Sequence, residues 1–217
     1  MDFTRLPELT KEEVRIIGSL IEKSRATPEY YPMTINGLKN ACNQKSSRNP
    51  VVDYDEDTVI EVLGNLRTKG LVGTMTGGGS RATKYKHNLS VHFSLDPADL
   101  AVLCLLMLRG PLTAGEINSN SGRLYDFDNL DEVIRILEEL SASEPAFVRK
   151  LTRKPGQKGE RFVHLFSPYD EDAEESNTGI VSSSNADTQA LVERVESLES
   201  QLAQLREDFD KLMEQLI

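Results

Sequence analysis

The chain lacks any apolar run long enough to cross a membrane. Its longest run, Leu100 to Leu108, has the length of a core helix, whereas a membrane-spanning helix needs about 20 apolar residues. The N-terminus has no basic stretch followed by an apolar one, so we expect no signal peptide. With 38% hydrophobic and 28% charged residues, the composition is that of a soluble protein without a membrane partner.

Cysteine is also scarce. Cys42 and Cys104 are the only two in the sequence, and both fall on the apolar face of a helical pattern. This placement favours small buried thiols over a disulfide bond. We therefore expect a cytoplasmic location.

Motifs for catalysis and metal binding are missing from the sequence. The histidines are His87, His92 and His164, and they form neither His-Glu-x-x-His nor any other spacing that zinc sites use. No Gly-Lys-Ser/Thr follows the glycine triplet at 77–79, which argues against a phosphate-binding loop. We expect a protein that is not an enzyme, with no catalytic residue, no metal and no cofactor.

Acidic residues are unevenly distributed. From Asp170 to the end of the chain there are 13 acidic and 3 basic residues, while residues 1–169 hold 22 of each sign. The net charge of −10 is therefore a property of the tail, and no acid occurs between Glu61 and Asp96. A nucleic-acid partner for the front of the chain is not excluded by the acidic composition.

A pattern of three helices and a β-hairpin occurs twice. In the first copy, Thr10, Thr34 and Asp55 are helix caps, and strands are expected at 71–75 and 82–87. The second copy has helices after Asp96, after Thr113 and over 133–140, with a hairpin from Phe147 to His164. Helix, polar turn, helix and hairpin in this order predict a winged helix, and the repetition predicts two.

The C-terminal part reads differently. Residues 168–187 have few large apolar side chains and are expected to be a flexible acidic linker. Apolar residues then recur alternately four and three positions apart over 188–217, which is a heptad pattern that predicts a parallel homodimer. The alternative is a single amphipathic helix packed on its own domain. The dimerisation positions are Leu191, Val195, Leu198, Leu202, Leu205, Phe209, Leu212 and Leu216.

The fold class that follows is mainly α with small β-hairpins, as two tandem winged-helix domains plus a C-terminal coiled-coil helix. The boundaries are 1–92 for the first domain, 93–167 for the second, 168–187 for the linker and 188–217 for the coiled coil.

Polar and basic residues gather on the turn and the hairpin of the first copy, the two elements that a winged helix presents to DNA. Cations there would neutralise phosphates, and the amides and hydroxyls could reach base edges. A solvated surface without a partner is the alternative. The candidate nucleic-acid-binding residues are Lys39, Asn43, Gln44, Lys45, Ser46, Arg48, Arg67, Arg81, Lys84 and Lys86.

The third helix of each copy argues against sequence-specific reading of DNA. Asp57 and Glu61 precede Arg67 in the first copy, and four carboxylates surround Arg135 in the second. Carboxylates facing a groove would meet phosphate repulsion, so the second copy in particular has the character of a protein-binding winged helix.

Several sequence blocks resemble an uncharacterised bacterial family, the YceH family. They are Tyr-Pro-Met-Thr-Ile-Asn-Gly-Leu from Tyr31, Ala-Cys-Asn-Gln-Lys-Ser-Ser-Arg-Asn-Pro-Val from Ala41, Leu-Arg-Gly-Pro-Leu-Thr-Ala-Gly-Glu from Leu108 and Arg-Phe-Val-His-Leu-Phe from Arg161. The resemblance spans Leu9 to Phe166 and implies tandem winged-helix domains without implying an activity.

The function expected from the sequence is binding without catalysis. The leading hypothesis is a dimeric, transcription-regulator-like protein whose first domain binds duplex DNA weakly, mainly through phosphates. The alternative is a protein–protein adaptor that uses its winged helices to bind protein partners.

Overall fold

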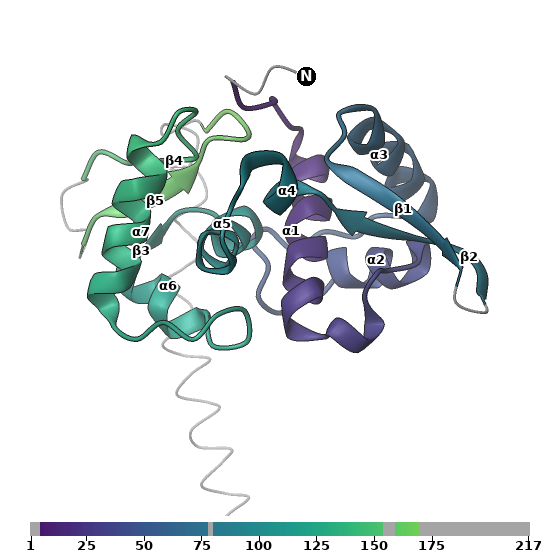
Figure 1. Cartoon of the computed structure of the whole chain (residues 1–217), viewed down its shortest axis with the longest axis horizontal. Helices are drawn as coiled ribbons and strands as arrows, with labels where there is room; N and C mark the ends of the chain where they lie inside the picture. The colour runs from purple at the N-terminus through teal and green to yellow at the C-terminus, as the bar shows by residue number, and fades with distance from the viewer. Residues whose placement is uncertain (1–4, 78–79, 154–158, 170–217) are drawn as a thin grey trace, which may run out of the picture. The chain divides into compact units, whose positions relative to one another are not determined.

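The computed structural model describes residues 5–77, 80–153 and 159–169 (Figure 1). The described helices are α1 (Lys11–Ala26), the 3-10 helix η1 (Pro28–Tyr30), α2 (Ile35–Cys42), α3 (Glu56–Thr68), α4 (Leu89–Phe93), α5 (Pro97–Arg109), α6 (Ala114–Asn120) and α7 (Leu130–Ala142). The described strands are β1 (Val72–Gly77), β2 (Ser80–His87), β3 (Leu112–Thr113), β4 (Val148–Lys150) and β5 (Arg161–His164).

Side-chain caps start most of these helices where the sequence places them. Thr10 and Glu13 form a reciprocal capping box at α1, and Thr113 and Glu116 form another at α6. Asp55 accepts a hydrogen bond from the Thr58 N–H at the start of α3. Each cap pairs backbone N–H groups that have no partner within the helix, so the helix starts are determined locally.

Two antiparallel sheets follow the same plan in the two halves of the described chain. β1 pairs with β2, and β5 lies between β3 and β4. Val72 lies opposite His87 in the first sheet, and Val148 lies opposite His164 in the second. This repeated register agrees with the internal repeat that the sequence predicts.

A second correspondence concerns the residues before α2 and before α6. Met33 forms a β-bridge with Tyr85, two residues before the end of β2, and Leu112 pairs with Phe162, two residues before the end of β5. The strand β3 and this bridge are features that the sequence pattern does not predict. We use first half for α1 to α4 and second half for α5 to β5.

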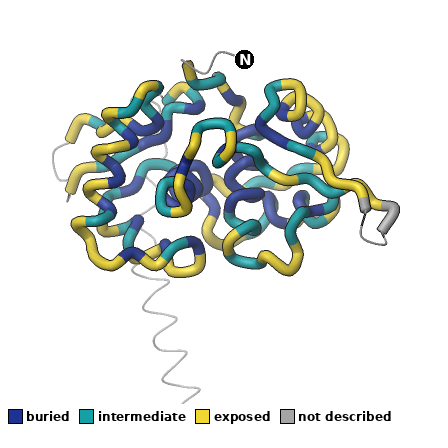
Figure 2. The backbone as a smooth tube through the Cα atoms, viewed as in Figure 1, coloured by how far each residue is buried: buried dark blue, intermediate teal, exposed yellow. Residues whose placement is uncertain are grey.

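Helix α1 is the centre of the first half and also packs on the second. It contacts α2, α3 and α5, and much of its length is buried (Figure 2). Ile16, Ile17, Leu20 and Ile21 are fully buried. The buried apolar residues of both halves form one continuous core. The predicted domain boundary at 92/93 falls within helix α4, and the division into two domains stays a prediction.

The contact between α1 and α5 depends on a glycine. A Cβ atom placed on Gly18 would lie 2.9 Å from Leu108 Cδ2 and 3.2 Å from Met107 Cβ. The Cys104 thiol of α5 lies 3.4 Å from the Gly18 carbonyl oxygen, to which it donates a hydrogen bond. A side chain at position 18 would therefore require Leu108 and Met107 to shift, so the close approach of the two helices relies on the glycine.

Both cysteines are free and buried, as the sequence predicts. Burial raises the pKa of Cys42 to about 11, and burial also raises the pKa of Cys104. Within the described ranges, none of the helices is both long and apolar enough to span a bilayer. A cytoplasmic location stays a prediction.

The mixed architecture of helices and small antiparallel sheets agrees with the expected mainly α class with β-hairpins. The assignment of each half to the winged-helix fold stays a prediction. The linker from position 170 onward and the coiled-coil helix, with its eight heptad positions from Leu191 to Leu216, lie outside the described residues.

Candidate functional site

The structure places Arg48, one of the predicted DNA contacts, inside the first half. Its side chain is fully buried and donates two hydrogen bonds to Glu22, with N–O distances of 2.7 and 3.0 Å. The same guanidinium donates to the Ala41 and Ser47 carbonyl oxygens. Arg48 therefore links the turn after α2 to α1. Because it is buried, it is not among the residues that could contact DNA at the surface.

Glu22 is ionised in this arrangement. Burial by itself would raise the pKa of its carboxyl group, but the hydrogen bonds and charges of Arg48 and Lys23 outweigh burial and lower the pKa. Lys23 Nζ lies 3.0 Å from the carboxylate. The ion pair between Glu22 and Arg48 therefore stabilises the turn after α2.

Two further predicted contacts, Asn43 and Gln44, make bonds within the protein. Asn43 accepts a hydrogen bond from the Tyr54 N–H and donates one to the Tyr54 carbonyl oxygen, at 2.9 and 2.8 Å. Gln44 Oε1 accepts hydrogen bonds from Lys23 and Arg48. These amides fix the shape of the turn rather than face outward to a base edge.

The remaining predicted contacts lie at or near the surface. Lys45, Ser46, Arg67 and Lys86 are exposed, whereas Lys39 and Lys84 are half-buried. Arg81 belongs to β2, but its side chain lies outside the described part of the structure.

Lys84 and Lys86 share one face of the hairpin. Residues two apart on a strand point to the same side, and these lysines pair across the hairpin with Met75 and Gly73. The exposed face of α3 carries Asp57 and Glu61 instead. The cations of the first half that remain available are therefore mainly on the hairpin and on the turn.

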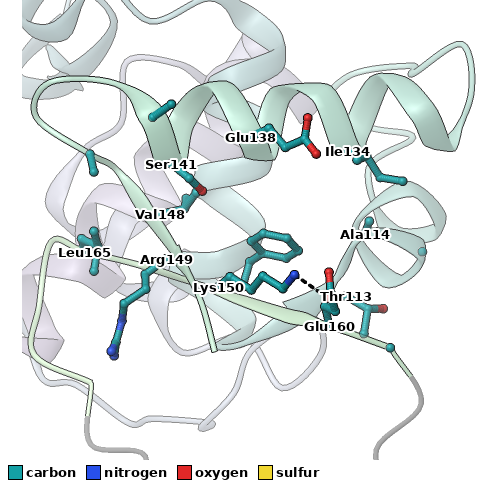
Figure 3. Close-up of a pocket in the computed structure, with 15 residues that line it drawn as sticks. Thr113, Ala114, Ile134, Glu138, Ser141, Val148, Arg149, Lys150, Glu160 and Leu165 are labelled. Carbon is teal, nitrogen blue, oxygen red and sulfur yellow. Dashed lines mark ion pairs between the residues drawn. The ribbon is translucent and has the colours of Figure 1, made fainter. Parts of the chain in front are cut away.

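The second half contains an apolar groove that the sequence does not predict. It has a volume of about 910 Å³ and lies between α7 and the face of β4 and β5. Figure 3 shows Ile134, Glu138 and Ser141 of α7 on one side and Val148 with Lys150 on the other. We call this surface the apolar groove.

Apolar side chains dominate the walls of the apolar groove. Val148, Phe162 and Leu165 line it from the sheet side, and Ile134 from α7 is 38% exposed. Leu130, one helical turn before Ile134, is 42% exposed. The rim carries an ion pair between Lys150 and Glu160 (Figure 3).

One sequence signal could have indicated the apolar groove. The buried stripe of α7 is Val133, Ile136, Leu137 and Leu140, and Ile134 lies outside it. Positions outside the buried stripe of a helix are normally polar or charged, so the aliphatic Ile134 at such a position marks a second apolar face.

The described residues were predicted to contain no metal site, and their clusters and buried histidines are as follows. Among them there is no group of three or more His, Cys, Asp or Glu side chains that could hold a metal ion. Burial lowers the pKa of both His87 and His164 to about 4, and the Lys86 charge adds to the effect at His87. Both imidazoles are therefore neutral and internal at physiological pH.

Comparison with known proteins places residues 9–157 in a family described as "Protein of unknown function, DUF480". A UPF0502 protein of Shewanella loihica is 44% identical over 204 residues, covering 92% of this chain and 95% of its own. A UPF0502 protein of Geotalea daltonii is 48% identical over 159 residues, covering 73% and 72%. A third, from Opitutus terrae, is 41% identical over 202 residues, covering 93% and 84%.

Proposed function

The chain belongs to the DUF480 family of uncharacterised bacterial proteins, the UPF0502 proteins, and from its own sequence pattern and surface we propose that it is a non-enzymatic adaptor of tandem winged-helix architecture. The repeated order of three helices and a hairpin supports two winged-helix units. The identification of this family with the YceH family stays a prediction, and so does the tandem winged-helix architecture.

The observation that carries the adaptor function is the apolar groove. Ile134 is 38% exposed and Phe162 is half-buried in the apolar groove, so apolar area there is in contact with water, and covering it with a partner is favourable. Binding an apolar segment there gains roughly 25 cal/mol for each Å² removed from water. In the proposed function, a protein partner supplies that segment.

The partner segment is an amphipathic helix. Leu130 lies four residues before Ile134 on the same face of α7, so it extends the exposed apolar surface of the helix beyond the apolar groove, which Ile134 lines. A helix laid beside such a surface contacts it with side chains at positions i, i+3, i+4 and i+7, the usual pattern of helix-in-groove recognition. The sheet face with Val148 and Phe162 forms the second wall of the same groove.

Site-specific crosslinking tests the adaptor function. A photo-reactive phenylalanine analogue replaces Ile134 in the full chain, and the protein that it crosslinks in the native bacterium is identified by mass spectrometry. A synthetic helix from that protein is then titrated onto the purified chain. The variant Ile134→Lys should weaken this binding about tenfold or more, because it places a charge in an apolar contact.

The matched control is Ile60 on α3, which is 47% exposed and lies outside the apolar groove. The photo-reactive residue at position 60 should not give the adduct, and Ile60→Lys should leave peptide affinity unchanged. Equal adducts at positions 60 and 134 would contradict the adaptor function. An adduct formed only with a second copy of this chain would replace it by self-association.

A second candidate function is weak binding to the phosphates of duplex DNA through the first hairpin. Lys84 and Lys86 lie on one face of β2, within a stretch of sequence that has no acid from 62 to 95. Together with Lys45 of the turn and Arg81 of β2 they make the four cations of this proposal, which no longer includes the buried Arg48.

Four phosphate contacts predict a slope of about −3 to −4 for log K against log salt, since each contact contributes about −0.9. The double variant Lys84→Ala, Lys86→Ala should reduce that slope by about two and weaken all DNA sequences alike. The control is the double variant Arg135→Ala, Lys150→Ala, which removes two cations from the second half and should leave the slope unchanged. An unchanged slope in the hairpin variant would exclude this mode of binding.

A further inference from the structure

A polar cleft of about 750 Å³ lies where the two halves meet, away from the apolar groove. The end of α1 and the turn after α2 contribute from the first half, and the ends of α5 and α6 contribute from the second. We call it the interhalf cleft. The turns that follow α2 and α6, which are equivalent in the sequence repeat, both reach it.

Positive charge exceeds negative charge in the interhalf cleft. Lys23 and Lys45 line it from the first half, and Arg109 and Arg123 line it from the second. Glu22 is the only acid among the described residues that line it, and its carboxylate oxygens are already bonded to Arg48 and Lys23. The interhalf cleft therefore presents an uncompensated positive potential to a ligand.

Arg109 is held in place by neutral partners from both halves. Its Nη2 donates to Ser47 Oγ at 2.9 Å, and its Nη1 donates to Asn120 Oδ1 at 2.8 Å. Its Nε atom is buried and makes no hydrogen bond with the part of the chain that the structure describes. The guanidinium is thus oriented without being neutralised, which is a feature of anion-binding arginines.

The turn that carries Lys45 and Ser47 has a strained backbone. Ser47 has φ of +60°, a left-handed conformation that favours glycine and costs a residue with a side chain on the order of 1 kcal/mol or more. Arg48 bonds the Ser47 carbonyl oxygen at 3.0 Å, and Arg109 bonds its hydroxyl group. Contacts from both halves therefore hold the turn in the conformation in which it lines the interhalf cleft.

The floor of the interhalf cleft is apolar. Leu105, Leu108 and Leu124 line it and are buried, and Ser46 and Ser119 are among its other lining residues. Its volume lies within the roughly 300–1,000 Å³ typical of small-molecule sites. A ligand that matches these surfaces has a phosphate for the cations and an uncharged body for the leucines.

We propose that the interhalf cleft binds a small phosphorylated organic molecule, with the phosphate held by Lys45, Arg109 and Arg123 and the uncharged body on the leucine floor. Such a ligand contacts both halves at once. A DNA backbone is less suited to this site, because an alternating row of phosphates would leave the leucine floor uncovered. This inference does not depend on the adaptor function.

Calorimetric titration of the full chain tests the proposal. The probes are adenosine 5′-monophosphate, which has an uncharged body, and inorganic pyrophosphate, which has none. Saturable one-to-one binding is expected for both, with adenosine 5′-monophosphate binding more tightly per charge. Lys45→Gln and Arg123→Gln, one from each half, should each weaken binding about tenfold. Both side chains are exposed, so the variants should fold, which circular dichroism checks.

The matched controls Arg67→Gln and Lys86→Gln remove the same charge from outside the interhalf cleft and should bind as the unmodified protein does. Equal weakening in these controls would overturn the proposal in favour of non-specific attraction. Displacement of the nucleotide by equal concentrations of sulfate would indicate an adventitious ion only. No saturable binding at millimolar concentration, or complete displacement by duplex DNA, would also overturn it.

Discussion

At the scale of single residues, the same side-chain types have opposite roles according to their partners. Arg48 and Arg109 both lie near the turn after α2, yet Arg48 is paired with a carboxylate, whereas Arg109 is bonded only to neutral oxygens. A buried charge whose partner is removed is costly, because the remaining charge is left without compensation. Arg48 therefore stabilises the fold, whereas Arg109 is one of the residues that we propose bind the ligand phosphate.

The first prediction concerns the Arg48–Glu22 pair. Arg48→Met should lower the free energy of unfolding by about 3 kcal/mol, because it leaves Glu22 partly buried and removes the bonds to the turn. Urea denaturation measures the loss. The control Arg135→Met breaks an ion pair with Glu139 in which the two side chains are 60% and 58% exposed, and it should leave the free energy of unfolding nearly unchanged. Similar losses in the two variants would contradict the assigned role of Arg48.

The second prediction concerns His164, whose pKa burial lowers from 6.5 to about 4. The folded state holds this imidazole neutral, so its contribution to stability is complete above pH 6.5 and is lost as the pH falls toward 4. His164→Leu should flatten the fall in stability in this window by up to about 1.4 kcal/mol per pH unit.

Chemical denaturation at a series of pH values measures that slope. Above the ordinary histidine pKa the two proteins should show the same pH dependence, which provides the internal control. Identical slopes below it would mean that His164 takes up its proton in the folded state.

At the scale of elements, helix α1 decides how the two halves are joined. Its cap and stripe can be read locally, but its buried surface extends almost all round the helix because it packs on α2, α3 and α5. Gly18 permits the closest of these approaches. A glycine in the middle of a helix normally costs stability, so its presence here reflects packing rather than helix propensity.

The third prediction compares two helical glycines. Gly18→Ala should destabilise the protein by about 1 kcal/mol or more, because the added Cβ meets Leu108 and Met107. Gly64→Ala on α3 has no described atom within 4 Å of the new Cβ and should stabilise the protein by up to about 1 kcal/mol. Thermal denaturation of the two variants measures the sign of each change in stability. A stabilising effect at position 18 would show that α1 and α5 can move apart without cost.

At the scale of the whole molecule, the acidic C-terminal segment and the described part have different chemistry. Residues 170–217 carry the entire net charge of −10 and the heptad positions, whereas residues 1–169 are electrically balanced. Self-association through the heptad would bring two copies of the apolar groove and the interhalf cleft into one particle. Such a particle would bind bivalent partners more tightly than one chain does.

The fourth prediction concerns that self-association. Truncation after Ser183 should convert a dimer into a folded monomer in sedimentation experiments, because it removes all eight heptad positions. In the full chain, Leu198→Asp with Leu205→Asp should have the same effect, since carboxylates at two seam positions cannot be buried without cost. A truncated protein that remains dimeric would place the interface within residues 1–183.

Sequence patterns predict three helices and a hairpin in each copy, because helical stripes, caps and glycine-rich turns act over a few residues. They do not predict the short helix α4, which has no side-chain cap. Thr10, Asp55 and Thr113 mark helix starts in any context that leaves the first turn intact. The internal repeat also follows from the sequence, since the same local signals recur in the same order.

The packing of elements that are distant in the sequence sets which polar residues are exposed at the surface. Arg48 of the turn after α2 is buried against Glu22 of α1, which lies 26 residues earlier and within hydrogen-bond distance, and no local pattern encodes that pairing. The apolar groove and the interhalf cleft likewise consist of side chains from segments far apart in the sequence. Periodicity reports which face of a helix is apolar, but the packing of the elements decides which face stays open.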